Sequence, residues 1–333
     1  MRSALPLRPL LLCAFAAAAA GCGSDSPGMT MPDPDPVHVP NFVKLQSDDG
    51  DWIGAGRSFN YTQADAVISV TANGGLVSVA VNGDEWWNAQ FQAPGATIQK
   101  GTYAGLARYP FHDPAKGGLI WGGEGRDCTT LTGSFTVDSV TYTAGKLARL
   151  DLRFEQHCGG AAAALRGTIH WRDDDTTAPA GPVSPAPSGL WQPPAGLPGA
   201  GNYAFLQSDP GDWVGAGQTQ LYTAPAAPVS VTADGGHVTV SVGGWRGDFQ
   251  TMGPLTQLQP GYYGGLMRYP FHNPAKGGMD WGGNGRGCNK LSGWFMVDQA
   301  TYSGGSLTAL DLRFEQHCEG SPAALRGAVH WRA

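Results

Sequence analysis

The sequence predicts an all-β protein built from two tandem antiparallel β-sandwich domains, of jelly-roll or immunoglobulin-like type. Among its 333 residues are 50 Gly and 25 Pro, and only 14% of residues are charged, which favours many short strands joined by turns. The segment Leu-Asp-Leu-Arg-Phe-Glu-Gln-His-Cys at residues 150–158 returns unchanged at residues 310–318. Within it, Leu152, Phe154, Gln156 and Cys158 face one way and the residues between them the other, which is the pattern of a half-buried strand.

The duplication extends well beyond this segment and divides the chain. We expect a first domain at residues 42–172 and a second at residues 202–333. A linker rich in Pro, Ala and Gly joins them at residues 173–201, and a Pro-rich tether at residues 22–41 precedes the first. Trp191 in the linker either docks on a domain or is exposed. A single deletion, in the loop after Val81, is expected to separate the two copies in length.

Turn signals within each copy predict hairpins. Asn73-Gly74-Gly75 lies between two apolar runs, and a turn near Gly145 joins residues 131–142 to residues 147–157. For the last hairpin of the first copy, we expect Cys158 opposite Leu165, with Phe154 opposite Ile169. The outward pairs would then be Asp151 with Arg172, Arg153 with His170, and His157 with Arg166.

The N-terminus has the features of an export signal at residues 1–21. Arg2 and Arg8 are followed by an apolar run at residues 10–20 that is too short to span a membrane. Residues 19–22, Ala-Ala-Gly-Cys, resemble the lipobox of bacterial lipoproteins, although Ala19 stands where that family usually has Leu. The resemblance implies lipidation of Cys22 and a membrane partner; an ordinary cleaved secretory signal is the alternative. Gly23 replaces the Asp of inner-membrane retention, which favours the outer membrane or cell surface over a periplasmic or secreted protein.

Four further cysteines are expected to form disulfides, because an exported protein meets oxidising conditions. Since each domain should fold alone, the predicted pairs are Cys128–Cys158 and Cys288–Cys318. Metal ligation by these thiols is the alternative, but no Cys-x-x-Cys spacing is present. The net charge of −6, which becomes about −8 without Arg2 and Arg8, argues against nucleic acid as a partner.

Two loops in each copy carry aromatic, His and Arg side chains that suit a sugar or a peptide. The alternative is that these loops fold on their own aromatic residues and close the end of the sandwich. The candidate ligand-binding residues are Arg108, Tyr109, His112, Trp121 and Arg126 in the first copy, and Arg268, Tyr269, His272, Trp281 and Arg286 in the second.

Three further features of the sequence are candidate functional sites. Asp48, Asp51, Asp209 and Asp212 lie in acidic loops that either hold Ca²⁺ or cap tight turns; the EF-hand spacing is absent. The stripe of Asp151, Arg153, Glu155 and His157 is either catalytic or a set of ion pairs on a wetted face. The Trp residues after the first hairpin, Trp86-Trp87 and Trp245, either contact a ligand or cover the core.

The motifs Arg-Tyr-Pro-Phe-His, Phe-Glu-Gln-His-Cys and Ala-Leu-Arg-Gly resemble those of a repeated domain of bacterial secreted and surface proteins. The resemblance implies an accessory extracellular module. We therefore expect a surface-anchored binding or adhesion module for a glycan or peptide, with no catalytic residues and no cofactor. A structural envelope lipoprotein without a ligand and a hydrolase are the alternatives.

Overall fold

The computed structural model describes residues 39–333, and these residues form an all-β protein. The predicted signal peptide, the lipidation site at Cys22 and most of the tether lie outside the described residues. Within residues 39–333, no helix has the length and apolar character needed to cross a membrane.

The strands form two ten-stranded sheets, which we call repeat 1 and repeat 2. Repeat 1 contains β1 (Phe42–Ser47), β2 (Ser58–Thr62), β3 (Val67–Asn73), β4 (Leu76–Asn82), β5 (Trp86–Gln92), β6 (Gly101–Arg108), β7 (Gly118–Gly123), β8 (Leu131–Thr143), β9 (Lys146–Cys158) and β10 (Leu165–Arg172). Repeat 2 contains β11 (Tyr203–Ser208), β12 (Thr219–Thr223), β13 (Ser230–Asp234), β14 (His237–Val242), β15 (Trp245–Gln250), β16 (Gly261–Arg268), β17 (Gly278–Gly283), β18 (Leu291–Ser303), β19 (Ser306–Cys318) and β20 (Ala324–Arg332).

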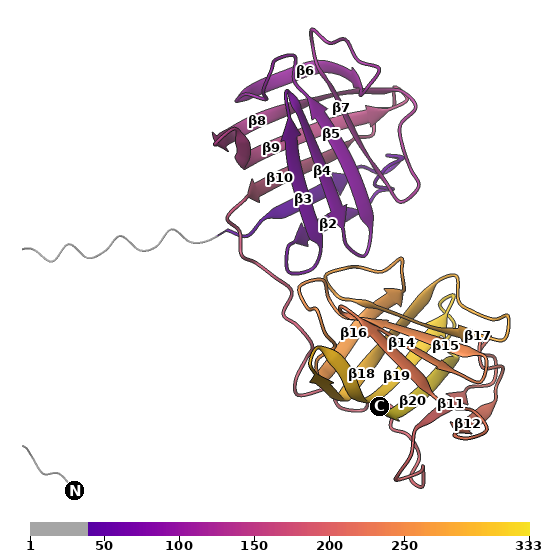
Figure 1. Ribbon diagram of the computed structural model, residues 1–333. Coiled ribbons are helices and arrows are strands. Elements are labelled where there is room, and N and C mark those ends of the chain that lie inside the picture. The colour runs from indigo at the N-terminus through magenta and orange to yellow at the C-terminus, as the bar shows by residue number, and fades with distance from the viewer. Residues whose placement is uncertain (1–38) are drawn as a thin grey trace, which may run out of the picture. The chain divides into compact units, whose positions relative to one another are not determined.

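Both repeats have the same strand order. In repeat 1 it is β2-β1-β10-β9-β8-β6-β7-β5-β4-β3, and repeat 2 follows the equivalent order from β12 to β13. Neighbouring strands are antiparallel except β6 and β7, which pair in parallel at only two positions, Ala107 with Gly118 and Arg108 with Leu119. Each repeat is therefore one continuous sheet, and Figure 1 shows that it is curled, so that β3, β4 and β5 cross over β8, β9 and β10.

Aromatic side chains fill the inside of the curl. The ring of Phe91 on β5 contacts Phe135 on β8 and Phe154 on β9, with ring centroids 5.4 Å apart in both cases. Trp121 on β7 stacks on Phe154 at 5.0 Å. Because these contacts join strands that are distant in the hydrogen-bonded order, they hold the two halves of the sheet against each other. Repeat 2 has the same core, with Phe249, Phe295, Phe314 and Trp281 in the equivalent places.

One buried polar side chain, Gln156 on β9, closes the curl. Its carboxamide oxygen accepts from the backbone N–H of Trp121 at 2.9 Å, and its amide nitrogen donates to the carbonyl of the same residue at 2.8 Å. Beyond its two pairs with β6, this edge of β7 has no strand partner, so without Gln156 both backbone groups of Trp121 would be buried and unpaired. Gln316 makes the same two bonds to Trp281.

The predicted disulfides are present in both repeats, as Cys128–Cys158 and Cys288–Cys318. The long hairpin of β8 and β9 positions the first of them, because it pairs Leu131 with Cys158 and so brings residue 128 to the same end. The hairpin predicted at Asn73-Gly74-Gly75 is also present, with Asn73 opposite Leu76.

The predicted register of the last hairpin is wrong by two residues. Leu165 lies opposite Gln156, and Ile169 lies opposite Leu152. The outward pairs change accordingly: His170 lies opposite Asp151, Thr168 opposite Arg153, and Arg166 opposite Glu155. Packing explains the shift, because Gly167 then faces Phe154, and a Cβ at Gly167 would lie 2.2 Å from that ring. A slip of two residues preserves the inward and outward faces, so those were predicted correctly.

The copies also differ in length at two places instead of one. Five residues separate Val81 from Trp87, but only two separate Val242 from Trp245, so the hairpin loop is three residues shorter in repeat 2. The next loop, before β16, is two residues longer than its counterpart before β6. Trp245 is therefore the equivalent of Trp87. Both are buried and donate their indole N–H to a Tyr hydroxyl, whereas Trp86 is 48% exposed.

We predict that replacing both Cys128 and Cys158 by Ala lowers the free energy of unfolding by roughly 3–4 kcal/mol, because the bond closes a loop of 30 residues. Chemical denaturation followed by fluorescence measures this loss. The matched pair Cys288→Ala with Cys318→Ala should behave alike, and a crossed link between the repeats in non-reducing peptide maps would contradict the pairing.

Candidate functional site

The residues of the predicted ligand platform do not form one surface. Arg108 donates to Asp127 at 2.9 Å and lies over the ring of Phe111, which is 78% exposed. Tyr109 stacks on His112, with ring centroids 5.5 Å apart. These two contacts show a loop that packs on its own aromatic residues while leaving Phe111 at its tip in solvent.

The other two members of the platform point elsewhere. Trp121 is completely buried in the core, as is Trp281 in repeat 2, so neither ring offers a surface to a ligand. Arg126 turns toward another loop, where its Nε donates to the carbonyl of Ile53 at 2.7 Å. In repeat 2, Tyr269 and His272 keep their stack, with ring centroids again 5.5 Å apart, and Arg268 again lies over the Phe at the loop tip. The other arginine contacts differ: Arg268 faces Asp280 at 3.9 Å, and Arg286 lies over the ring of Trp245. Ligand binding by the loop that holds Arg108, Tyr109 and His112 stays a prediction.

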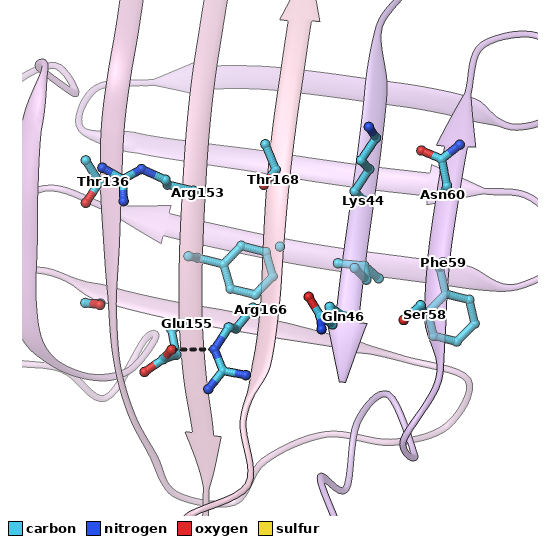
Figure 2. A pocket seen from close by; sticks show the side chains of 14 residues that line it. Lys44, Gln46, Ser58, Phe59, Asn60, Thr136, Arg153, Glu155, Arg166 and Thr168 are labelled. Atoms are coloured by element: carbon cyan, nitrogen blue, oxygen red, sulfur yellow. Dashed lines mark hydrogen bonds and ion pairs between the residues drawn. The ribbon is translucent and has the colours of Figure 1, made fainter. Parts of the chain in front are cut away.

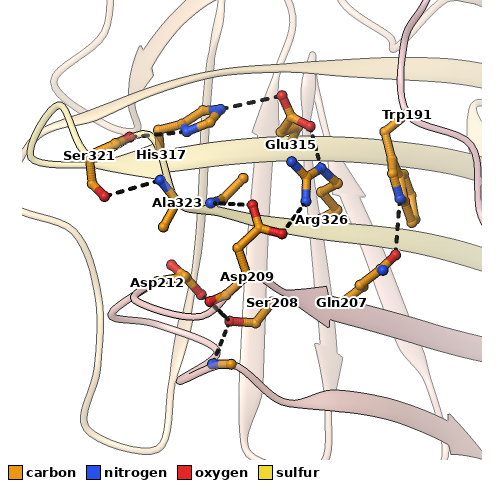
Figure 3. A network of polar contacts seen from close by, with 12 residues as sticks. Trp191, Gln207, Ser208, Asp209, Asp212, Glu315, His317, Ser321, Ala323 and Arg326 are labelled. Atoms are coloured by element: carbon orange, nitrogen blue, oxygen red, sulfur yellow. Dashed lines mark hydrogen bonds and ion pairs between the residues drawn. The ribbon is translucent and has the colours of Figure 1, made fainter.

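The acidic loops form capped turns. The Oδ2 atom of Asp51 accepts from the hydroxyl of Ser47 and from the N–H of Gly54, both at 2.7 Å. Asp48 accepts from the N–H of Ala164 and from Arg166. Asp212 and Asp209 repeat these contacts in repeat 2 (Figure 3). Nowhere in residues 39–333 do three or more His, Cys, Asp or Glu side chains gather to hold a metal ion, and calcium binding here stays a prediction.

A groove of about 730 Å³ lies on the outer face of the sheet of repeat 1. It crosses β2, β1, β10, β9 and β8, and its floor is the backbone of these strands (Figure 2). Its walls are outward side chains with hydroxyl, amide or charged groups. They are Lys44, Gln46, Ser58, Asn60, Ser134, Thr136, Arg153, Glu155, Arg166 and Thr168.

A charged network fixes one end of the groove. Arg166 donates to Glu155 and to Asp48, both at 2.7 Å, and Nε2 of His157 lies 3.1 Å from Glu155. Hydrogen bonds from His157 and Arg166 lower the pKa of Glu155, and the hydrogen bond from Arg166 lowers the pKa of Asp48. Both carboxylates are therefore ionised at neutral pH. The same four-residue network recurs in repeat 2 as Asp209, Arg326, Glu315 and His317 (Figure 3).

The equivalent face of repeat 2 is covered by the chain's own linker. The indole N–H of Trp191 donates to Gln207 at 3.1 Å (Figure 3). The ring of Trp191 lies parallel to that of Phe205. Arg313 donates to the carbonyl of Trp191 at 2.8 Å. The side chain of Arg313 is only 9% exposed, whereas that of Arg153, its equivalent in repeat 1, is 61% exposed. Of the two alternatives for Trp191, the structure shows docking.

Repeat 2 also carries a carboxylate pair that repeat 1 lacks. Asp248 on β15 lies directly opposite Asp280 on β17, where repeat 1 has Gln90 opposite Ile120. Burial raises the pKa of Asp280 to about 6. Burial acts in the same direction on Asp248, but hydrogen bonds from Arg246 and Thr239 outweigh it and lower the pKa of this carboxyl. The two acids therefore differ in charge near pH 6.

Comparison with known proteins identifies no relative: no family model, curated protein or solved structure matches the chain. The function is therefore inferred from the geometry of the two repeats.

Sequence reasoning did not find the groove, because it interpreted the outward stripe of β9 as a wetted face. A signal was nevertheless present in the comparison of the copies. Lys44, Ser134 and Thr136 correspond to Phe205, Trp294 and Met296, so the outward positions diverge where the core positions are kept.

We predict that Asp280→Asn stabilises the protein at pH 8 by on the order of 2 kcal/mol and has little effect at pH 4. The folded state holds the proton up to about pH 6, so the carboxyl favours folding at low pH and opposes it progressively as pH rises from about 4 through 6. Thermal unfolding at both pH values measures the effect.

Asp248→Asn is the matched control, because its lowered pKa gives the opposite sign: this variant should lose stability at pH 8. An equal change at pH 4 and pH 8 for Asp280→Asn would show that ionisation is not the cause.

Proposed function

We propose that this protein is an exported binding protein whose ligand site is the groove on the outer face of repeat 1. Its ligand is a neutral oligosaccharide that lies across the strands. The observation that carries the proposal is the contrast between the repeats: the groove is open and polar in repeat 1, whereas the equivalent face of repeat 2 is aromatic and covered by the linker.

The dimensions of the groove suit a short chain molecule. Its five strands span four inter-strand spacings, or about 19 Å. Its volume of about 730 Å³ falls within the usual range for small-ligand sites. A compact ligand would fill only part of such a groove, whereas an oligosaccharide of several rings contacts its full length.

The chemistry of the walls favours a neutral ligand with many hydroxyl groups. Six of the side chains that line the groove make no hydrogen bond to another residue in the described part of the chain. Lys44 is charged. The other five are uncharged: Gln46, Ser58, Asn60, Ser134 and Thr168. Arg166 pairs with both Glu155 and Asp48, and Arg153 pairs with Asp138, so the protein's own ion pairs engage these charged side chains. Hydroxyl and amide groups both donate and accept, which matches sugar hydroxyls better than it matches an anion.

The charged network at the end of the groove argues against a hydrolytic function. Acid catalysis by two carboxyl groups needs one that keeps its proton near neutral pH. The pKa of Glu155 and that of Asp48 are both lowered, so neither has this property. Binding therefore accounts for the groove better than catalysis does.

The location and organisation of the protein complete the proposal. The signal at residues 1–21 directs export, and lipidation of Cys22 anchors the protein at the outer membrane or cell surface. Each repeat is a separately folding module of the sandwich class, and residues 173–201 join the two. The disulfides support the export step, because such bonds persist in oxidising compartments.

We predict that groove variants carrying the residues of repeat 2 lose glycan binding. A glycan array should identify the ligand, and Lys44→Phe, Asn60→Leu or Thr136→Met should each weaken its binding at least tenfold by calorimetry. Repeat 2 already tolerates these side chains at the equivalent strand positions, so folding should be preserved.

Ser69→Ala is the control, because Ser69 is exposed on β3, away from the residues that line the groove. Unchanged affinity in all three groove variants, or a protein that binds peptides and no glycan through this groove, would refute the proposal.

We also predict that Cys22→Ala transfers the protein from the membrane fraction to the soluble fraction, because a lipid on this residue is the proposed anchor. Fractionation followed by immunoblotting measures the distribution. Retention of the variant in the membrane fraction would contradict lipid anchoring.

A further inference from the structure

The linker crosses the outer face of repeat 2 from one side to the other. At one end, Val183 forms an isolated antiparallel bridge with Tyr262 on β16: each N–H donates to the other residue's carbonyl, at 2.8 and 3.0 Å. At the other end, Trp191 is held by Gln207 on β11 and by Arg313 on β19. The segment therefore has two anchors, at strands that are distant in the sheet.

The length of the segment is sufficient to reach both anchors. In sheet order, β16 and β11 are separated by β18, β19 and β20, which is a distance of about 19 Å. The eight residue steps from Val183 to Trp191 reach at most about 27 Å. The segment can therefore span the strands with slack, and the structure uses that slack for bends at residues 182, 184 and 185 and a turn at residues 188–189.

The face beneath the linker is aromatic. The ring of Trp191 lies 6.4 Å from that of Phe205, with 2° between their planes. Farther along, the rings of Tyr262 and Trp294 are 6.0 Å apart, and Pro182 packs so closely on Gly261 that a Cβ there would lie 2.8 Å from it. In repeat 1, the positions of Phe205, Trp294 and Tyr262 hold Lys44, Ser134 and Thr102.

The linker is rich in proline, which suits an aromatic surface. It contains Pro182-Val183-Ser184-Pro185, two prolines separated by two residues, and further prolines follow at 187, 193 and 194. Aromatic surfaces suit proline-rich segments, because proline rings are apolar and lose little conformational entropy on binding. The docked segment is bent and is not a continuous polyproline II helix: the Ser184–Pro185 bond is cis, and residues 188–189 form a turn. The sheet edge at Tyr262 adds backbone hydrogen bonds, as in strand addition.

We propose that the outer face of repeat 2 is a binding groove for proline-rich peptides, that residues 182–191 occupy it as an internal ligand, and that a proline-rich segment of a partner polypeptide takes their place. This site is separate from the groove of repeat 1 and from its oligosaccharide ligand.

The contacts of the linker are few enough for exchange. Among the described residues, four hydrogen bonds hold residues 182–191 on this face: one from the Trp191 indole, one from Arg313 and two in the bridge at Val183. The ring stack on Phe205 and the packing of Pro182 on Gly261 add to them, while Val183 remains 50% exposed. Because the linker is tethered, its effective concentration at the groove is of order millimolar. A free peptide of the same sequence therefore competes poorly with it until an anchor is removed.

The test is competition between this internal ligand and an added one. The probe is a fluorescent synthetic peptide with the sequence of residues 180–194, and its binding to the full chain is followed by anisotropy. Trp191→Ala should raise the affinity for the probe at least tenfold over the unchanged protein. Val183→Pro, which removes the N–H that bonds to Tyr262, should also raise it and leaves the groove side chains intact.

Two controls locate the effect. Adding Phe205→Lys, the residue of repeat 1, to Trp191→Ala should abolish the gain, because the stacking surface is lost. Trp86→Ala removes an exposed Trp from repeat 1 and should leave probe binding as weak as in the unchanged protein. Failure of both linker variants to bind the probe more tightly, or equal binding with Phe205→Lys present, would overturn the proposal; loss of glycan binding at repeat 1 would not bear on it.

Discussion

The two hydrogen bonds between Gln156 and the backbone of Trp121 are the constraint on which the fold of each repeat depends. One edge of β7 pairs with β5, and the other pairs with β6 at only two positions. The rest of this second edge has no strand partner, although it lies inside the core. An unpaired buried N–H or carbonyl destabilises the folded state by about 1–3 kcal/mol. The side chain of Gln156 on β9 pairs with both the N–H and the carbonyl of Trp121. Cys158, which forms the disulfide with Cys128, lies two residues farther along β9.

Sequence reasoning was reliable where the determining interactions are local. Alternation along β9 predicted which side chains are buried, including Gln156, and the turn at Asn73-Gly74-Gly75 predicted a hairpin. The pairing of Cys128 with Cys158 followed from a hairpin and a duplication, both visible in the sequence. The all-β character of the protein was therefore predictable, and so were its two disulfides.

Features that depend on packing between distant segments were not predicted from the sequence. The register of β9 with β10 depends on the space that Gly167 leaves for the Phe154 ring, which strand patterns alone do not reveal. Trp121 was predicted to lie on one of the two candidate binding loops, yet it lies on β7, is completely buried and packs on Phe154. The groove arises from curvature of the whole sheet, so no single segment encodes it. In the sequence, the groove is indicated by a position-by-position comparison of the two copies, which differ at outward positions and agree at core positions.

The repeats share a core and differ on one face, and that difference has a physical logic. A polar face such as that of repeat 1 stays hydrated, and its hydroxyl and amide groups exchange water for a ligand at small net cost. An aromatic face such as that of repeat 2 would expose Phe205, Trp294 and Tyr262 if nothing covered it, and contiguous apolar patches favour association. The linker supplies the cover from within the chain, and its prolines limit the conformational entropy that it loses on docking. Duplication thus yields two different outer faces on one scaffold: the first is a polar groove, and residues of the linker pack on the second.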